Sequence, residues 1–338
     1  MALSPLMRRR FERLRGNKRA YWSLWVFAGI FALATCAELF CYHKPFLVFC
    51  EGRFYFPYVV TYSDETFGGS LVTEADYKDP ETQTFIRDKG GWMLWPLVHY
   101  RHDTVNLERQ APAPPSAENW LGTDSSGRDV LARLLYGLRV SLLFGLGLMC
   151  FTVLLGVSAG SLQGFFGGTL DLLMQRFVEL WSGLPVLFLL IILSGFIRPT
   201  LWWLLGIMLL FSWMGLASLV RAEFLRVRQH DYVRAAQVLG VPSSRIMLRH
   251  MLPNAMVATL TYLPFLLNHS IATLTSLDFL GFGLPPGSAS LGDLLQQGKN
   301  NLHAPWLGLS AFFSMVLVLM LITFVGEGLR DAFDPRQQ

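Results

Sequence analysis

Charged residues are few in this sequence. Asp, Glu, Lys and Arg make up 15% of its 338 residues, whereas 52% are hydrophobic, and the hydrophobic residues occur in long runs. About a quarter of the residues in a typical soluble domain are charged. The composition therefore excludes an ordinary water-soluble domain.

The sequence also lacks a nucleotide-binding motif. The segment GDLLQQGKN at 292–300 has five residues between its glycines, where a P-loop has four, and no Ser or Thr follows Lys299. We therefore expect no nucleotide site and no cofactor in this chain. Metal ligands are sparse too. His99, His102 and Asp103 would be part of an external site at most, and zinc needs three or four ligands, so we interpret them as surface residues.

Long hydrophobic runs are present instead, and they predict an all-α polytopic membrane protein with six transmembrane helices. A helix needs about 20 consecutive apolar residues to cross the hydrocarbon core of a bilayer. Five runs meet this length, at 21–40, 140–163, 201–220, 256–277 and 306–325. We place the sixth crossing within 168–197. The start of that segment is predicted to lie at the interface or in the cytoplasm, and the part from Pro185 to Ile197 in the membrane.

The distribution of Lys and Arg predicts how these helices are oriented. Residues 1–20 carry seven basic residues and residues 221–254 carry six, and cytoplasmic flanks retain positive charge. With six crossings, both segments and residues 331–338 lie in the cytoplasm. A full-length apolar run without a small-residue cleavage site follows the basic start, so we expect 21–40 to be an anchor rather than a cleaved signal peptide. The net charge of +4 reflects topology, and no nucleic-acid partner is expected.

Residues 41–118 are expected to form an external, periplasmic insert with some β-structure. The segment KPFLVFCEGRFYFPYVV alternates like a strand and predicts a hairpin around Glu51-Gly52. The adjacent prolines of APAPPS at 111–116 exclude a helix and indicate an extended linker.

The four cysteines permit only limited conclusions. Cys36 and Cys150 fall within hydrophobic runs, where a small buried apolar side chain is the simplest interpretation. Cys41 and Cys50 would both lie on the oxidising side of the membrane. Their spacing permits a disulfide without requiring one, so their redox state stays open.

The segment 119–139 is predicted to be an amphipathic helix in the membrane interface. Thr123 or Asp124 is suited to cap its start. A single apolar stripe follows, formed by Val130, Leu131, Leu134, Leu135 and Leu138. A soluble helix packed on the insert is the alternative, but the direct continuation into the next hydrophobic run favours the interface.

The segment YVRAAQVLGVPSSRIMLRHMLPN at 232–254 predicts two short helices joined by a bend. Asp231 is suited to cap the first helix, and Gly240 supplies the left-handed residue that ends it. Ser243 is suited to cap a second helix that stops before Pro253. Such a segment is either a docking element for a partner protein or a connecting loop.

The same segment resembles the EAA loop of ABC-importer permeases. The matching positions are Ala235, Ala236, Gly240, Leu252 and Pro253. Arg234 stands where the family has glutamate, and His250 where isoleucine is usual. The resemblance implies that this loop transmits closure of the ATPase subunits to the membrane helices, with Asp231, Arg234 and Arg245 among the coupling residues. We expect Arg234 to meet an acidic residue of the ATPase.

Other segments resemble the oligopeptide and dipeptide permeases, specifically the C-type subunit. They are WLGTDSSGRDVLARLLYG, GFFGGTLDLLMQRFVELWSGLP, LDFLGFGLPPGSASLGDLL and GEGLRDAFDPR. RGNKRAYWSLWVF and the large insert are similar to the Yej-type permeases of peptide and microcin C importers. The resemblance covers nearly the whole chain and assigns the permease core to 140–330.

This resemblance implies inward transport of peptides or peptide-like compounds across the bacterial inner membrane by alternating access. It also implies the partners, which are a second non-identical permease, two ATP-binding subunits that hold ATP and magnesium, and a periplasmic substrate-binding protein. Related permeases serve nickel chelates, glutathione or other small solutes, which are the alternative cargo.

Polar residues in the run 256–277 are candidates for lining a translocation path. They are Tyr262, Asn268, His269, Thr273 and Ser276. Hydrogen bonding between neighbouring helices is the alternative, and both interpretations stay open. His269 with Ser310 is faintly similar to the Ser/His pair of a rhomboid-type protease. Such a pair requires hydrogen-bond geometry that a sequence does not supply, and we predict a transporter subunit rather than an enzyme.

Two further groups of residues complete the predicted sites. Arg176 and Glu179 are three residues apart and are expected to pair on one helix face, in a block where Asp171 and Pro185 also match the family. An external face for the binding protein is expected from Gly122, Asp124, Arg128, Asp129, Asp278, Gly281 and Gly283. Arg128 and Asp129 are candidates for structural anchors of that face.

Overall fold

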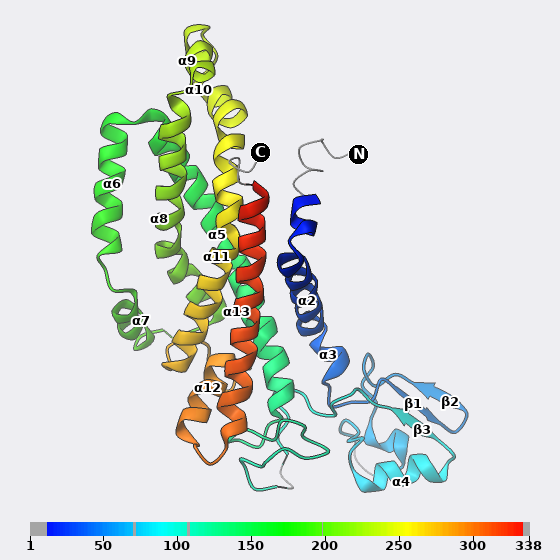
Figure 1. Ribbon diagram of the computed structural model, residues 1–338. Coiled ribbons are helices and arrows are strands. Elements are labelled where there is room, and N and C mark those ends of the chain that lie inside the picture. The colour runs from blue at the N-terminus through cyan, green and yellow to red at the C-terminus, as the bar shows by residue number, and fades with distance from the viewer. Residues whose placement is uncertain (1–11, 70–71, 107–108, 198, 334–338) are drawn as a thin grey trace. The chain divides into compact units, whose positions relative to one another are not determined.

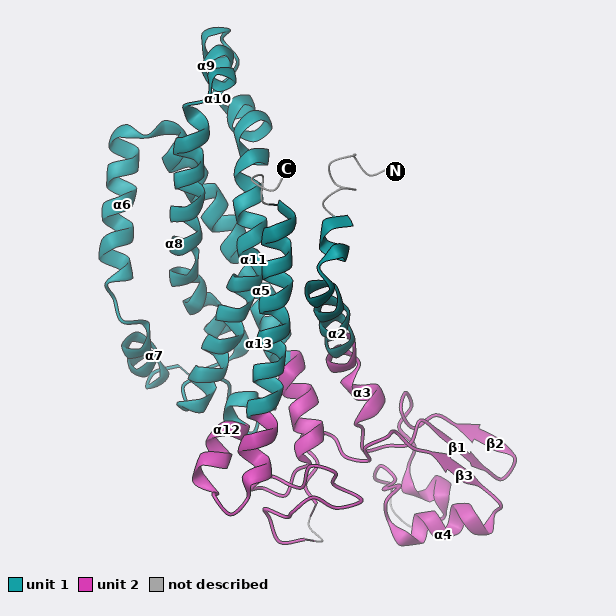
Figure 2. Ribbon diagram, in the orientation of Figure 1, with its two compact units in different colours: residues 1–31, 140–293, 312–338 teal, residues 32–139, 294–311 magenta. Residues whose placement is uncertain are grey.

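The computed structural model describes residues 12–69, 72–106, 109–197 and 199–333, and it is mostly helical (Figure 1). The chain divides into two compact units (Figure 2). The first unit comprises residues 1–31, 140–293 and 312–338, and the second comprises 32–139 and 294–311. Parts of the predicted termini, including Arg8, Arg9, Arg10 and 334–338, lie outside the described residues.

The first unit is a bundle of long helices. Its elements are α2 (Lys18–Thr35), α5 (Val130–Phe166), α6 (Gly168–Ser182), α7 (Val186–Ser194), α8 (Leu201–Arg228), α9 (Asp231–Val238), α10 (Ser243–Arg245), the π-helix η2 (Ile246–Met251), α11 (Leu252–Phe279) and α13 (Pro305–Phe333). Helices α2, α5 and α13 extend into the second unit. Two clusters of buried apolar residues hold the bundle together around α5, α8 and α11.

Glycines let α5 and α8 approach closely. Gly156, Gly160 and Gly164 are spaced by four residues and therefore lie on one side of α5. A Cβ atom added at Gly156 would lie 2.9 Å from the Leu216 Cβ atom, and one at Gly160 would lie 3.0 Å from the Arg221 nitrogen. Small residues at this spacing are typical of helix packing in membranes.

Four helical segments within the described ranges are long and apolar enough to cross a membrane. They are Val130–Phe166, Leu201–Arg228, Ser243–Phe279 and Pro305–Phe333, and the bent pair of α6 and α7 raises the number to five. Helix α2 falls outside this group because its 18 residues include Lys18 and Arg19 and it ends at Thr35. The structure thus has the helices of a polytopic membrane protein.

The segment 168–197 differs from its prediction. Its first helix, α6, lies along α8, with the Trp181 Nε1 donating to the Leu210 carbonyl oxygen at 3.1 Å. The second helix, α7, has nine residues, so it is only about 14 Å long. This is about half of the hydrocarbon thickness. The part from Pro185 to Ile197 is therefore too short to cross alone, and a crossing here requires both helices, which meet at an angle of 61°.

The helix predicted over 119–139 begins later and is not a separate element. Helix α5 starts at Val130 and continues without a break to Phe166, and turns precede it. Asp129 sets this start because its Oδ1 atom accepts the backbone N–H of Ala132 at 2.8 Å, as an N-cap does.

The second unit contains the predicted β-structure. Strands β1 (Leu47–Cys50), β2 (Arg53–Tyr55) and β3 (Trp92–Leu94) form an antiparallel sheet in the order β2-β1-β3. The other elements are α3 (Ala37–Phe40), η1 (Asp64–Phe67), α4 (Pro80–Asp88) and α12 (Leu291–Asn300). The predicted hairpin is confirmed, with φ of 51° at Glu51 and 78° at Gly52. Two consecutive positive φ angles are the signature of the type I′ turn that suits twisted strands.

The two cysteines of the insert are free thiols. Cys41 and Cys50 are both buried and are not joined by a disulfide. Burial raises the pKa of the Cys41 thiol to about 12, with a smaller contribution from Asp129. The disulfide that the spacing permits is therefore absent, and Cys50 packs in the core beneath the sheet instead.

Candidate functional site

The predicted coupling segment projects from one end of the helical unit as α9, α10 and η2 (Figure 1). Helix α9 begins at Asp231, so Asp231 is its first residue rather than its cap. His230 has the extended backbone of the cap position, and its carbonyl accepts the N–H groups of Val233 and Arg234. An acidic residue in the first turn still complements the helix dipole.

Gly240 ends α9 as predicted. Its φ is +75°, which only glycine adopts without strain. The Gly240 N–H donates to the Gln237 carbonyl at 3.1 Å, and the Val241 N–H donates to the Ala236 carbonyl at 3.1 Å. These two bonds form a Schellman motif, which satisfies the last carbonyls of the helix.

The second helix does not stop before Pro253. Pro242, rather than Ser243, occupies the cap position, and α10 continues through η2 into α11 as one helical segment, Ser243–Phe279. Proline has no N–H to donate to the carbonyl four residues earlier, and its ring crowds that carbonyl. The wider π-turn of η2 ends at Met251, two residues before Pro253, and lets the chain remain helical. The loop is thereby joined rigidly to a membrane helix.

The coupling segment has its own core. Val233, Ile246 and Met251 are fully buried and pack with Phe224 and Val227 of α8. Asn254 Nδ2 also donates to the Tyr232 hydroxyl at 2.8 Å, which ties α9 to the start of α11. The segment is therefore an ordered element rather than a flexible connection.

The tip of this segment exposes large apolar side chains. Val238 is 88% exposed, Leu239 81% and Leu248 59%. The predicted coupling residues Asp231, Arg234, Ala235, Arg245 and Pro253 are exposed as well, whereas Ala236 and Leu252 are half-buried. Exposed apolar patches mark interaction surfaces. The sequence prediction missed the apolar tip, although apolar residues directly before a glycine bend were the available signal.

A second feature near this end is an ion pair between α6 and α8. Arg221 donates to both carboxylate oxygens of Asp171, from Nε at 2.5 Å and from an Nη at 2.6 Å. Bidentate pairs of this kind fix geometry as well as charge. The predicted pair of Arg176 and Glu179 is confirmed at 2.6 Å, with both side chains exposed. The sequence prediction named Asp171 but missed its partner.

The polar residues of α11 divide into two groups. Asn268 Nδ2 donates to the Thr323 hydroxyl at 2.8 Å and to the Leu319 carbonyl at 3.1 Å, so it holds α11 against α13. Tyr262, His269 and Ser276 are exposed and Thr273 is half-buried. Their role in a translocation path stays a prediction.

A tight elbow follows α11. The Gly281 N–H donates to the Asp278 carbonyl and the Phe282 N–H to the Leu277 carbonyl, which is a second Schellman motif. The buried Asp278 carboxylate accepts the Leu284 N–H at 2.6 Å and the Ser290 hydroxyl. A Cβ atom at Gly283 would overlap this carboxylate. The buried Asp278 carboxylate therefore stabilises the elbow through these hydrogen bonds.

The remaining residues of the predicted external face belong to the second unit. Asp124 is buried, and its carboxylate contacts the Arg128 Nε at 2.8 Å and an Arg133 Nη at 3.2 Å. Gly122 has φ +75°, and a Cβ atom there would lie 2.6 Å from the Ala113 carbonyl oxygen. Neither Thr123 nor Asp124 caps α5, because both bond within the preceding turns.

Arg128 and Asp129 hold together the turns before α5, and their role as anchors of an external face stays a prediction. The Asp129 carboxylate accepts Asn119 Nδ2 at 2.8 Å and is fully buried, and burial raises its pKa. Arg133 is fully buried beside Asp124 and was missed, because a lone Arg in an amphipathic pattern reads as a surface residue.

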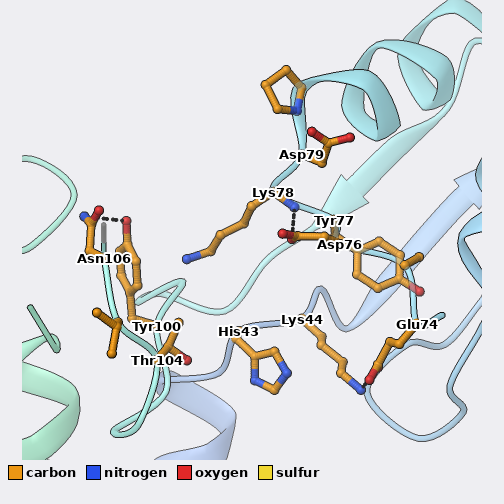
Figure 3. Close-up of a pocket in the computed structure, with 13 residues that line it drawn as sticks. His43, Lys44, Glu74, Asp76, Tyr77, Lys78, Asp79, Tyr100, Thr104 and Asn106 are labelled. Carbon is orange, nitrogen blue, oxygen red and sulfur yellow. Dashed lines mark hydrogen bonds and ion pairs between the residues drawn. The ribbon is translucent and has the colours of Figure 1, made fainter. Parts of the chain in front are cut away.

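A hollow of about 560 Å³ opens in the insert (Figure 3). Lys44 pairs with Glu74 at its edge. The Lys78 ammonium lies 3.4 Å from the centre of the Tyr100 ring. Burial and the neighbouring Lys44 and Arg101 lower the pKa of His43. The charges along the hollow thus offset one another, and we assign it no ligand.

Other candidate residues have local roles. The segment 292–300 lies on helix α12 rather than on a phosphate-binding loop. The ring of His99 packs on Trp95 at 4.8 Å, and that of His102 on Tyr136 at 4.5 Å. The Ser310 hydroxyl donates to the Leu307 carbonyl of its own helix at 3.2 Å.

Comparison with known proteins identifies the family. The model of the inner membrane component of binding-protein-dependent transport systems matches residues 153–338. The chain is 56% identical over 337 residues to the inner membrane ABC transporter permease protein YejE of Escherichia coli K12, covering 99% of this chain and 98% of that protein. It is 51% identical over 363 residues to the peptidoglycan transport system permease protein YejE of Agrobacterium fabrum, covering 99% and 94%.

A more distant relative is the oligopeptide transport system permease protein OppC of Bacillus subtilis, which is 34% identical over 238 residues, covering 70% of this chain and 78% of that protein. The matches therefore extend from full-length relatives to permeases that share the core. With its apolar helices and its ordered, exposed coupling segment, this chain belongs to the inner membrane permease components of binding-protein-dependent ABC transport systems.

Proposed function

We propose that this permease imports peptides or peptide-like compounds, including peptide fragments of peptidoglycan. The single observation that carries the proposal is full-length similarity to a peptidoglycan transport permease, at 51% identity over 99% of this chain. The oligopeptide permease OppC shares the core at 34% identity, which supports a cargo with a peptide backbone.

The proposal includes six membrane crossings. Five come from the four long apolar helices together with the bent pair of α6 and α7, which is counted as one crossing. The sixth is formed by α2 together with α3, which follow one another across a single residue, Cys36, and together run from Lys18 to Phe40. At about 1.5 Å per residue, these 23 positions are long enough to cross the hydrocarbon core. Both termini and the coupling segment then lie in the cytoplasm, and the insert lies in the periplasm.

The partners in this proposal follow from the resemblance to binding-protein-dependent peptide permeases. A periplasmic binding protein delivers cargo, and this chain forms the path with a second, non-identical permease. The exposed tip around Val238 and Leu239 contacts one of two ATP-binding subunits, which hold ATP and magnesium. The continuous helix Ser243–Phe279 supports transmission, because only the short bend at 240–242 separates the tip from a helix that continues into α11.

The test compares accumulation of a labelled cell-wall tripeptide in cells with and without the chain. Wild type restores uptake, whereas Gly240→Val reduces it at least tenfold. A β-branched residue at φ +75° costs about 1–2 kcal/mol and displaces the apolar tip. Gly16→Ala is the matched control, because Gly16 is also exposed with open space around it but has no positive φ.

The possible outcomes test the peptide cargo and the coupling role of the bend separately. Equal uptake by cells with and without the chain contradicts the peptide class, and other small solutes are then screened. Equal uptake by Gly240→Val and Gly16→Ala at similar membrane levels contradicts the coupling role of the bend.

A further inference from the structure

One face of the sheet in the insert is exposed although it is apolar. Successive residues of a strand point to opposite faces, and Val48 and Cys50 point into the core. The opposite face consists of Leu47, Phe49, Phe54, Trp92 and Leu94, which the strand register sets side by side. We call these five residues the outer face.

The outer face differs from that of an ordinary antiparallel sheet. Such a sheet usually packs one apolar face on a core and presents polar residues on the other. Here Phe54 is 57% exposed, Trp92 49% and Leu94 52%. Phe49 contacts both aromatic neighbours, with ring centres 5.0 Å from Phe54 and 6.3 Å from Trp92. A contiguous apolar surface of this kind marks a protein or membrane contact.

Helix α4 covers the other side of the sheet. Ile86 of α4 packs with Val48 and Phe67 in the core. In Figure 2, α4 lies below the strands of the magenta unit. The outer face is therefore the face turned away from α4.

The end of α3 lies beside the membrane boundary of α5. Arg139 Nη contacts the Glu38 carboxylate of α3 at 3.2 Å, and the Tyr136 hydroxyl donates to the Cys41 carbonyl at 3.2 Å. After Arg139 the helix is apolar for many residues and meets the criteria for a membrane span. Because charged side chains avoid the hydrocarbon core, the Arg139–Glu38 pair marks the level of the membrane surface.

The sheet is tied closely to this level. Six residues separate Phe40 from Leu47, which reach at most about 20 Å when extended. The Val98 N–H donates to the Phe40 carbonyl at 2.8 Å, and the Phe46 N–H donates to the Leu94 carbonyl at 2.8 Å. The segment that leaves the sheet is thus bonded to the end of α3, and the segment that enters the sheet is bonded to β3.

We propose that the outer face rests on the lipid bilayer at the end of α3 and α5. Phe54, Trp92 and Leu94 enter the headgroup region, where the amphipathic ring of Trp is favoured. A lipid surface fits better than a protein partner because all five residues are apolar and the face continues from a membrane boundary. The insert then acts as a membrane-supported platform, and this role is independent of the cargo.

The test places the photoreactive residue benzoylphenylalanine at single positions of the full chain, expressed with its partners in membranes that contain radiolabelled phosphatidylethanolamine. Positions Phe54 and Trp92 probe the outer face. Thr84, an exposed residue of α4 on the other side of the sheet, is the matched control. Replacing an exposed aromatic residue by a larger aromatic one preserves the fold, and Leu94 supplies an additional position.

Irradiation is expected to give at least ten times more lipid adduct at positions 54 and 92 than at 84. Adducts mainly to a protein, whether the second permease or the binding protein, would overturn the proposal. Lipid labelling no greater than at Thr84 would overturn it as well.

Discussion

At the scale of single residues, buried charges organise the turns before α5. Asp124 and Arg133 are both fully buried and lie 3.2 Å apart, and Arg128 adds a second cation at 2.8 Å. Burial removes these groups from water, which costs several kcal/mol for each ion unless a partner compensates. The three residues therefore act as a unit, and loss of one weakens the charge compensation of the others.

Arg133→Met is predicted to destabilise the chain by about 3 kcal/mol, the lower end of the range for breaking a buried pair, because Arg128 still contacts Asp124. Thermal unfolding of the purified full chain in detergent measures this effect. The matched control is Arg176→Met, whose pair with Glu179 is exposed, so it changes stability by less than about 1 kcal/mol. Equal shifts for the two variants would contradict the argument.

At the scale of elements, the π-turn η2 sets the orientation of the coupling segment. It lies between α10 and α11 and ends at Met251, two residues before Pro253. A π-turn accommodates one extra residue per turn, so it rotates everything before it relative to a regular α-helix. Within this turn, Leu248 is exposed and Ile246 is buried.

Pro253→Ala restores a backbone N–H and removes the ring that crowds the preceding carbonyl. We expect the turn to become α-helical, which rotates the coupling tip by about 100° relative to α11. Peptide uptake then falls at least fivefold while the amount of chain in the membrane is unchanged. Pro242→Ala, at the exposed cap position of α10, is the control and leaves uptake unchanged. Wild-type uptake by Pro253→Ala would refute this account.

At the scale of the whole molecule, half-buried histidines make the stability of the insert depend on pH. His43 and His102 of the insert are half-buried, and burial lowers the pKa of both. Asp103 opposes this shift at His102 without reversing its direction. Below the ordinary histidine pKa of about 6.5, the unfolded insert therefore binds more protons than the folded insert. By linkage, acid shifts the equilibrium toward unfolding.

The insert is thus predicted to lose stability as the pH falls from 7 to 5. Hydrogen exchange of peptides from 41–106 should accelerate over this interval. His102→Phe keeps the ring contact with Tyr136 and removes one titrating group, so it reduces the pH dependence. Faster exchange at pH 7 than at pH 5 would have the wrong sign for this mechanism.

Much of the architecture could be predicted because its causes are local. Hydrophobic runs of sufficient length predict membrane helices, and the Glu51-Gly52 hairpin and the Gly240 bend follow from backbone preferences of a few residues. The resemblance to a permease family likewise depends on short blocks. These features are determined by the sequence itself.

The tertiary structure decided which side chains contact one another and which face of the sheet is buried. Arg221 pairs with Asp171, which lies 50 positions earlier in the chain. Asn268 donates a hydrogen bond to Thr323 of α13. Local patterns do not specify such contacts, because they depend on which helices pack together and at what rotation. The outer face is similar, since alternation predicts two faces of a strand but only α4 decides which one is buried. Packing therefore determined which side chains form pairs and which are buried, because burial depends on neighbours that are distant in the chain.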